Sequence, residues 1–298
     1  MSDTENMVIV QLNGGLGNQM FQYANGRAIA FRNQVALGLD TSILQRSYSR
    51  PYKLCYFNVS AELVSPEQVR RVIEAGTTKA SRLKNSVAQS LKPYYRRKIF
   101  RERLQGYDPN ILKAIPPVYL AGYWQSEEYF KDIEGIIREE LRHKQPPDAF
   151  NLASLGEIQA TNSVSVHVRR GDYVTNPKTN QVHGLCTLDY YDRAVQIMAE
   201  KVEHPHFYIF SDDIEWSQTN LKLNFPTRFV SHNGIEMDYE DLRLMSHCKH
   251  HILANSSFSW WGAWLSGFSQ KIVIAPIHWF NDPSLDSRHA LPRGWIRI

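Results

Sequence analysis

The sequence predicts an α/β protein of two domains, and three observations lead to this expectation. The chain has 298 residues, while a domain usually holds about 100–200 residues. Short apolar runs alternate with helical stretches, a pattern typical of right-handed crossovers and parallel sheets. A polar segment with a Pro-Pro pair, residues 144–150, interrupts the alternation and is the candidate linker.

The N-terminal domain, expected over residues 1–147, opens as a βαβ unit. Its first apolar run, MVIVQL, has the pattern of a buried strand and leads into three glycines and a helical stretch. In chain order we expect a strand at 7–12, a helix at 19–32, a strand at 35–39, a mostly helical polar region at 62–113, a strand at 117–123 and an amphipathic helix at 126–143.

The alternation resumes in the C-terminal domain, expected over residues 148–298. We expect strands at 163–168, 206–210, 227–230, 251–254 and 271–275, and helices at 189–203, 238–248 and 257–268. The two domains are expected to face each other across a crevice. Ligands of parallel sheets bind beyond the carboxyl ends of the strands. Because the unusual residues of this chain lie there repeatedly, the sequence predicts an enzyme.

Composition excludes several classes of protein. The chain is 43% hydrophobic and 21% charged, close to the globular average, which excludes wholesale disorder. Its net charge of +4 is too small to indicate a nucleic-acid-binding protein. Three widely spaced cysteines without CxxC spacing predict neither a disulfide framework nor a zinc site, and favour a reduced setting. The first residues do not form a signal peptide and no apolar run reaches the roughly 18 residues of a membrane span, so we expect a cytoplasmic protein.

One segment departs from this charge balance. Residues 79–103 carry nine Lys or Arg residues against one acid, Glu102. Such a run is usually a solvated helix face, but it could also contact an anionic membrane surface. The second alternative implies a peripheral position at the inner membrane.

The first motif, NGGLGNQ at residues 13–19, lies between the first strand and the first helix. Glycines let the backbone approach a ligand closely, and a helix N-terminus offers free N–H groups. The motif is neither a dinucleotide fingerprint nor a Walker loop. Asn18 and Gln19 add amide donors at the tip of the loop and favour a ligand contact, and a purely structural turn is the alternative.

The second motif, HVRRGD at residues 167–172, stands at the end of a predicted strand. Alternation puts His167 and Arg169 on one face and Arg170 on the other. Two guanidiniums at a strand end indicate an anionic ligand, which arginine holds bidentately. The alternative is an internal ion pair with Asp172. We expect both, with Arg169 on the ligand and Arg170 held internally.

The third motif is the pair Asp212 and Asp213, directly after the predicted strand FYIF. Carboxylates there suit the N–H groups of a guanine base or the hydroxyls of a ribose, but Asp213 could equally begin a helix as its cap. The chain contains no DxD sequence, the motif that holds a divalent cation in metal-dependent sugar transferases. We therefore expect arginine and backbone N–H groups, not a metal, to meet the charge of a leaving group.

The fourth motif, NSSFSWWGAW at residues 255–264, follows another predicted strand. Small hydroxyl side chains at a helix start either cap the helix or bind phosphate. The candidate ligand contacts are Asn255, Ser256, Ser257 and Phe258. The tryptophans are expected in the core. The nearby HCKHH, residues 247–251, resembles a metal cluster, but no matching ligand set occurs elsewhere and we expect no metal there.

The segments GGLGNQMFQYANGRA, HVRRGDYV, SDD and NSSFSWWGAWL resemble glycosyltransferase family 11, the α-1,2-fucosyltransferases, in the same order along the chain. Without a signal anchor, the chain is most similar to bacterial members. The resemblance implies a GT-B fold, with two Rossmann-like domains facing across a cleft. It also implies GDP-β-L-fucose as the sugar donor, inversion at the anomeric carbon, no metal or other cofactor, and the 2-hydroxyl of a terminal β-galactoside as the acceptor.

The resemblance also implies roles for individual residues. Arg169 corresponds to the arginine on the β-phosphate, and His167 with one of Asp212 and Asp213 corresponds to the guanosine contacts. The turn that binds phosphate matches Ser256, Ser257 and Phe258, and the loop that closes on the pyrophosphate and fucose matches Gly15, Gly17 and Asn18. Of these residues Asn18 is expected to be catalytic, together with Arg169 and Asp172. The first domain would then be mainly the acceptor side, and the second would bind GDP-fucose.

The catalytic base is less determined. In α-1,6 relatives a glutamate lies five residues beyond the aspartate of the second motif, and here that position is Pro177. By elimination Asp172 is the candidate base; alternatively it holds one of the arginines, or the leaving phosphate accepts the proton. Two alternative functions also stay open, namely a GDP-sugar transferase of another linkage or donor, and a non-catalytic nucleotide- or glycan-binding protein.

Overall fold

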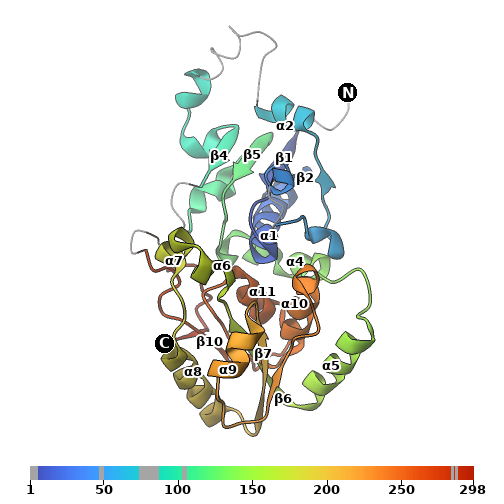
Figure 1. Cartoon of the computed structure of the whole chain (residues 1–298). Coiled ribbons are helices and arrows are strands. Elements are labelled where there is room, and N and C mark those ends of the chain that lie inside the picture. Colours follow the sequence, from blue (N-terminus) through green and yellow to red (C-terminus); the bar gives the residue numbers. More distant parts are fainter. Residues whose placement is uncertain (1–5, 47–49, 74–86, 103–105, 283–284, 286–287) are drawn as a thin grey trace. The chain divides into compact units, whose positions relative to one another are not determined.

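The computed structural model describes residues 6–46, 50–73, 87–102, 106–282, 285 and 288–298. The chain divides into two compact units (Figure 1). The first comprises Met1–Lys144 with Arg288–Ala290, and the second comprises Gln145–Ser287 with Leu291–Ile298. The boundary between Lys144 and Gln145 lies inside the segment that the sequence indicates as a linker. Each unit is built on its own parallel sheet, so the α/β class and the two Rossmann-like units are confirmed.

The first unit contains a five-stranded sheet in the order β3-β2-β1-β5-β4, with parallel pairing throughout. Its strands are β1 (Met7–Gln11), β2 (Ala36–Asp40), β3 (Glu62–Leu63), β4 (Ile99–Arg101) and β5 (Val118–Ala121). Helix α1 (Leu16–Asn33) connects β1 to β2, which confirms the βαβ opening. The close packing of α1 on the sheet requires Gly26, where a Cβ would lie 2.3 Å from Cγ2 of Val10.

The expectation of a mostly helical region at 62–113 is wrong where β3 and β4 form. These strands have only two and three residues, too few to show a period, and they form because β2 and β5 offer open edges. The described part of this region also contains α2 (Pro66–Ile73) and the 3₁₀ turns η4 (Tyr94–Arg96) and η5 (Pro109–Lys113).

The amphipathic helix expected at 126–143 is shorter and broken. It consists of the turns η6 (Glu127–Tyr129) and η7 (Lys131–Ile133) and the helix α4 (Glu134–Glu140). The Oγ of Ser126 accepts a hydrogen bond from the backbone N–H of Glu128, at 3.3 Å, and so starts the first turn. Two further turns of this unit are η2 (Leu44–Arg46) and η3 (Leu54–Tyr56).

The second unit contains a six-stranded sheet in the order β11-β10-β9-β6-β7-β8, again with parallel pairing. Its strands are β6 (Asn162–Val168), β7 (Pro205–Ser211), β8 (Thr227–Phe229), β9 (His250–Ile252), β10 (Val273–Ala275) and β11 (Ile296–Arg297). Its helices are α5 (Ala149–Ala160), α6 (Gly171–Thr175), α7 (Pro177–His183), α8 (Leu188–Lys201), α9 (Ile214–Asn220), α10 (Asp238–His247) and α11 (Ser257–Leu265), with the turn η8 (Ile235–Met237). The five strands and three helices expected for this domain are all confirmed.

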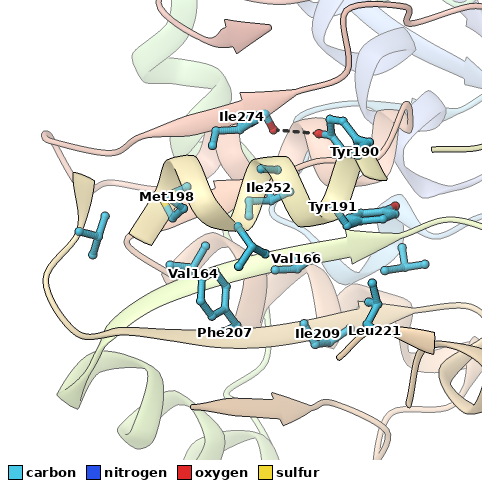
Figure 2. Close-up of a cluster of buried hydrophobic side chains, with 14 residues drawn as sticks. Val164, Val166, Tyr190, Tyr191, Met198, Phe207, Ile209, Leu221, Ile252 and Ile274 are labelled. Carbon is cyan, nitrogen blue, oxygen red and sulfur yellow. Dashed lines mark hydrogen bonds between the residues drawn. The ribbon is translucent and has the colours of Figure 1, made fainter. Parts of the chain in front are cut away.

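The core of the second unit lies between α8 and the sheet. Figure 2 shows α8 running along the strands, with Met198 and Tyr191 packed against apolar side chains of β6 and β7 such as Val166 and Phe207. The hydroxyl of Tyr190 donates to the carbonyl of Leu253 at 2.6 Å, which ties the helix to the segment after β9. Trp260 and Trp261 are fully buried, and Trp264 is nearly so. This confirms their expected place in the core.

Candidate functional site

The motifs of the second unit meet at the topological switch point of its sheet. From β6 the chain proceeds to β7 on one side of the sheet and later returns to β9 on the other. Loops after strands diverge at such a point and leave room for a ligand. Residues 169–172 follow β6, Asp212 and Asp213 follow β7, and residues 255–258 follow β9.

Arg169 lies at the centre of this group of charges. Its Nη1 is 2.7 Å from Oδ2 of Asp212, and its Nη2 contacts the carboxylate of Asp172. Burial by itself lowers the pKa of Arg169, but the carboxylates of Asp212 and Asp172 raise it, and the net shift is upward. The guanidinium is therefore a permanent positive charge whose position is determined by two carboxylates.

Arg170 is held by different partners. Its Nε lies 3.1 Å from Oδ2 of Asp213, and its guanidinium carbon lies 3.7 Å from the ring centroid of Trp216. Its backbone N–H donates to Oδ1 of Asp212 at 2.8 Å. This confirms the expectation that Arg170 is held internally. Asp213 also caps α9, since Oδ1 accepts from the N–H of Trp216 at 3.2 Å.

His167 is a buried imidazole beside this cluster. Its ring lies 5.5 Å from the ring of Phe258, centroid to centroid. Burial, with a smaller effect from the charge of Arg169, lowers its pKa to about 3, so the ring is neutral at neutral pH. Within the described ranges its Nδ1 has no hydrogen-bond partner. It is a buried polar atom of the kind that usually finds one.

The turn at 255–258 begins α11. The Oγ of Ser256 accepts from the backbone N–H of Phe258 at 3.3 Å, so Ser256 is the N-cap. Asn255 joins this turn to α7, because its Nδ2 donates to the carbonyl of His183 at 2.6 Å. Its own carbonyl accepts from the hydroxyl of Tyr173 at 3.2 Å. Of the four predicted residues, Asn255 therefore links the turn to α6 and α7 by hydrogen bonds. Ser257 and Phe258 lie in the first turn of α11.

The glycine-rich loop of the first unit lies at the switch point of the other sheet, between β1 and β5. Gly14 has a φ of +80°, a left-handed conformation that glycine adopts without strain. Gly15 is the N-cap of α1, and Gly17 and Asn18 lie in its first turn. The loop is rigid, because the buried side chains of Gln19 and Gln22 bond to its backbone at Gly14 and Asn13.

A second segment of the first unit supports this loop, and sequence reasoning missed it. After β5, the carbonyl of Gly122 accepts from Nε2 of Gln22 at 3.1 Å, and Nε2 of Gln125 donates to Oδ1 of Asn18 at 2.8 Å. The carboxylate of Glu102, after β4, accepts from the backbone N–H of Tyr123 at 2.6 Å. Burial raises the pKa of Glu102 to about 7, although this hydrogen bond opposes the shift. From the sequence, Glu102 was noted only as the single acidic residue of the basic run.

A second missed residue is His183, the last residue of α7. Its ring stacks on that of Tyr173, with centroids 4.9 Å apart and an interplanar angle of 9°. The guanidinium carbon of Arg169 lies 5.2 Å from the same tyrosine ring. Burial lowers the pKa of His183, and the charge of Asp172 opposes this shift. No periodic pattern marks a single histidine at a helix end, so the sequence carried no signal for it.

The histidines of HCKHH have separate partners. The Nδ1 of His247 donates to the carbonyl of Arg243, His250 accepts from the backbone N–H of Ile272, and the buried His251 bonds to Oγ of Ser165. In the part of the chain that the structure describes, no group of three or more His, Cys, Asp or Glu residues is placed to hold a metal ion.

The basic run lies only partly in the described residues. Lys79, Arg82, Lys84 and Arg103 fall outside them. Near the remaining cations, Leu91 has 82% of its surface exposed and Val87 has 55%. Among the described helices, none is long and apolar enough to cross a membrane.

Two Rossmann-like units in one chain, each built on its own parallel sheet, are the architecture of the GT-B class of glycosyltransferases. The chain belongs to glycosyltransferase family 11, whose family model matches residues 86–298.

Several known proteins are similar to the chain. It is 35% identical over 307 residues to an alpha-1,2-colitosyltransferase of Escherichia coli, covering 98% of this chain and 99% of the relative. It is 32% identical to the O-antigen biosynthesis glycosyltransferase WbnK of the same species, and the match covers 90% of this chain and 93% of the relative. It is 23% identical to the mouse galactoside 2-alpha-L-fucosyltransferase Sec1, covering 94% and 69%. Among solved structures, the fucosyltransferase NodZ from Bradyrhizobium aligns with a TM-score of 0.48 at 13% identity, covering 87% of this chain and 92% of that one.

Proposed function

We propose that the protein is an inverting α-1,2-fucosyltransferase, which transfers L-fucose from GDP-β-L-fucose to the 2-hydroxyl of a terminal β-galactoside. The observation that carries this proposal is the position of Arg169, a guanidinium oriented by Asp212 and Asp172 at the switch point of the second unit. The similarity of the chain to a galactoside 2-alpha-L-fucosyltransferase supports the α-1,2 linkage and a β-galactoside as the acceptor.

In this proposal Arg169 binds the β-phosphate of the sugar donor. As the bond between the anomeric carbon and the phosphate oxygen breaks, negative charge develops on the departing GDP. A guanidinium already in place stabilises that charge without rearranging. Asp172 and Asp212 orient Arg169, since both carboxylates contact its terminal nitrogens.

The neighbouring residues support binding of the rest of GDP. The N-terminus of α11, with Ser256, Ser257 and Phe258, offers N–H and hydroxyl groups to a phosphate. The neutral ring of His167 has a buried Nδ1 that would gain a partner in a guanosine contact. Because positive charge and N–H groups converge here, we propose that transfer requires no divalent metal.

A second candidate differs only in the sugar. The 35% identity to an alpha-1,2-colitosyltransferase favours GDP-colitose as the sugar donor. Colitose is fucose without its 3-hydroxyl, so the two reactions need the same leaving-group chemistry. They differ in whether the site hydrogen-bonds that hydroxyl, and a site built to bond it rejects the deoxy sugar strongly.

The test is mass spectrometry of the purified protein with lactose and EDTA, with GDP-fucose, GDP-colitose and GDP-mannose supplied in separate reactions. A product heavier by one deoxyhexosyl unit, from GDP-fucose, is the expected result, and NMR of that product gives the linkage and anomeric configuration. Product from GDP-colitose alone would select the second candidate. Absence of both transfer and GDP release with all three sugar nucleotides would contradict the proposal and favour a non-catalytic binding protein.

We also propose a peripheral contact with an anionic membrane through the described part of the basic run. The exposed side chains of Val87 and Leu91 lie in the same segment as Lys92, Arg96 and Lys98, a combination that favours such surfaces. The protein is expected to sediment with phosphatidylglycerol vesicles and not with phosphatidylcholine vesicles. Leu91→Ser with Lys92→Glu should abolish sedimentation. Leu152→Ser, at a position 61% exposed in the second unit, should leave it unchanged.

A further inference from the structure

We propose that His183 is the general base of the reaction and takes the proton from the attacking hydroxyl of the acceptor, an inference that rests on the proposed function. The residue is the last of α7 (Pro177–His183), the helix that follows α6 and the second motif.

The ring of His183 is held in place by Tyr173, the same tyrosine whose ring the guanidinium of Arg169 contacts. The ring stacks on Tyr173 and lies 5.8 Å from the ring of Phe280, centroid to centroid. The carbonyl of His183 accepts from Nδ2 of Asn255, in the turn that begins α11. Because Tyr173 also contacts the guanidinium of Arg169, a shift of this histidine would disturb the cluster around that arginine.

The ring nitrogens of His183 have no hydrogen bonds to the described residues. Histidines with a purely structural role commonly use a ring nitrogen to bond a carbonyl or carboxylate. In the same unit His247 does so with the carbonyl of Arg243, and the ring of His251 bonds to the hydroxyl of Ser165. An ordered, half-buried imidazole whose nitrogens are left to solvent is suited to bind an acceptor hydroxyl.

Neighbouring charges also suit His183 to accept a proton. Burial and the positive charge of Arg169 lower the pKa of His183, so that the ring is neutral at neutral pH and can accept a proton. The charge of Asp172 acts in the opposite direction and would stabilise the imidazolium once it forms. The carboxylate of Asp172 is itself engaged by the guanidinium of Arg169, so Asp172 orients the arginine in this scheme and His183 takes the proton.

The step balances as a single displacement. The acceptor oxygen forms a bond to the anomeric carbon while its proton moves to a ring nitrogen of His183. The bond from the anomeric carbon to the β-phosphate oxygen breaks, and its electron pair leaves with GDP, where Arg169 stabilises the charge. Release of the proton from the imidazolium to solvent then restores the base.

The test compares His183→Ala with the matched variant His206→Ala. His206 stacks on Tyr208 at 4.8 Å, also in the second unit, but at the amino end of β7. We expect His183→Ala to lower kcat by about 10²–10⁴-fold, the usual contribution of a general base, with GDP affinity unchanged. Added imidazole should restore part of kcat. The fall of kcat at acid pH should be lost, and in the protein without substitution this fall is expected below the ordinary imidazole pKa of about 6.5, because the pKa of His183 is lowered. His206→Ala should retain kcat.

Two results would overturn the inference. One is a kcat for His183→Ala close to that of the unchanged protein. The other is a loss of kcat that imidazole does not restore and that GDP affinity follows in parallel, which would indicate a structural role. Both results are judged by comparing kcat of His183→Ala with kcat of the protein without substitution. If that protein transfers no sugar, the proposed function fails first, and the two failures remain distinguishable.

Discussion

Arg169 and Asp212 form an ion pair across the carboxyl ends of two adjacent strands, with Nη1 and Oδ2 2.7 Å apart. They follow β6 and β7, which pair in parallel up to Val168 and Ser211. The register of the sheet therefore brings together two residues that are far apart in the sequence.

Removing this guanidinium should remove transfer while leaving the fold intact. Arg169→Ala is expected to lower kcat by about 10²–10³-fold or more, because a positioned charge no longer meets the departing phosphate. Initial rates with GDP-fucose and lactose measure this effect. The matched control is Arg193→Ala, which breaks an exposed ion pair with Asp189 on α8 and should change nothing. Near-normal turnover in Arg169→Ala would refute its phosphate role.

Loss of the carboxylate of Asp212 should act on the binding of the sugar donor. Asp212→Asn leaves an amide facing Nη1 of Arg169, while the remaining oxygen can still accept from the N–H of Arg170. We expect KM for GDP-fucose to rise by about tenfold, the equivalent of one charge-assisted hydrogen bond, with a smaller change in kcat. An unchanged KM would show that Asp212 does not orient the arginine.

Chelation should leave transfer largely unaffected. The proposed leaving-group contacts are Arg169 and the N-terminus of α11, and neither depends on a divalent ion. Rates measured in EDTA, and again after adding Mn²⁺ or Mg²⁺, are expected to agree. A complete loss in EDTA that Mn²⁺ reverses would contradict the metal-free proposal.

Glu102 should make the first unit less stable as pH rises. Burial raises its pKa in the folded protein from the ordinary 4.5 to about 7, so its contribution to stability is fully present below pH 4.5 and is lost as pH rises through 7. The shift corresponds to about 3 kcal/mol at most. Denaturant unfolding from pH 5 to pH 8 should show a smaller pH dependence in Glu102→Gln than in the unchanged protein.

The second unit offers a control for this measurement. Burial also raises the pKa of Asp241 to about 7. Asp241→Asn should therefore reduce the pH dependence of unfolding in the same way as Glu102→Gln. It should not affect the segment after β5, residues 122–125, and it should not affect sugar transfer. Equal slopes for Glu102→Gln and the unchanged protein would contradict the raised pKa.

The close contact between α1 and the first sheet should make Gly26→Ala destabilising. In Gly26→Ala the new methyl group would lie 2.3 Å from Val10 and 3.0 Å from Leu37, so we expect a loss of about 1–3 kcal/mol in the free energy of unfolding from overpacking. Gly156→Ala, on α5 with nothing within 4 Å of the new Cβ, should instead gain about 0.5–1 kcal/mol. Urea unfolding measures both, and a neutral Gly26→Ala would contradict the packing.

In the second unit the longer elements β6, β7, α8 and α10 could be predicted from the sequence because they are long enough to show their periods. The helices α5, α6, α7 and α9 and the two-residue strand β11 were not predicted. The middle part of the first unit, residues 62–113, was harder to predict. β3 and β4 have two and three residues, and only the open edges of β2 and β5 make them strands. Their register with those neighbours is a property of the sheet, not of the segments themselves.

The motifs at 13–19, 167–172, 212–213 and 255–258 were visible because glycines, arginines and paired acids are unusual directly after a strand. The sequence by itself determined the α/β class, the two units and the residues that follow the strand ends. Only the tertiary structure decided which carboxylates hold Arg169 and that Asn255 connects two helices. It alone singled out Glu102 and His183, because burial, stacking and the fields of neighbouring charges arise only when distant segments pack together.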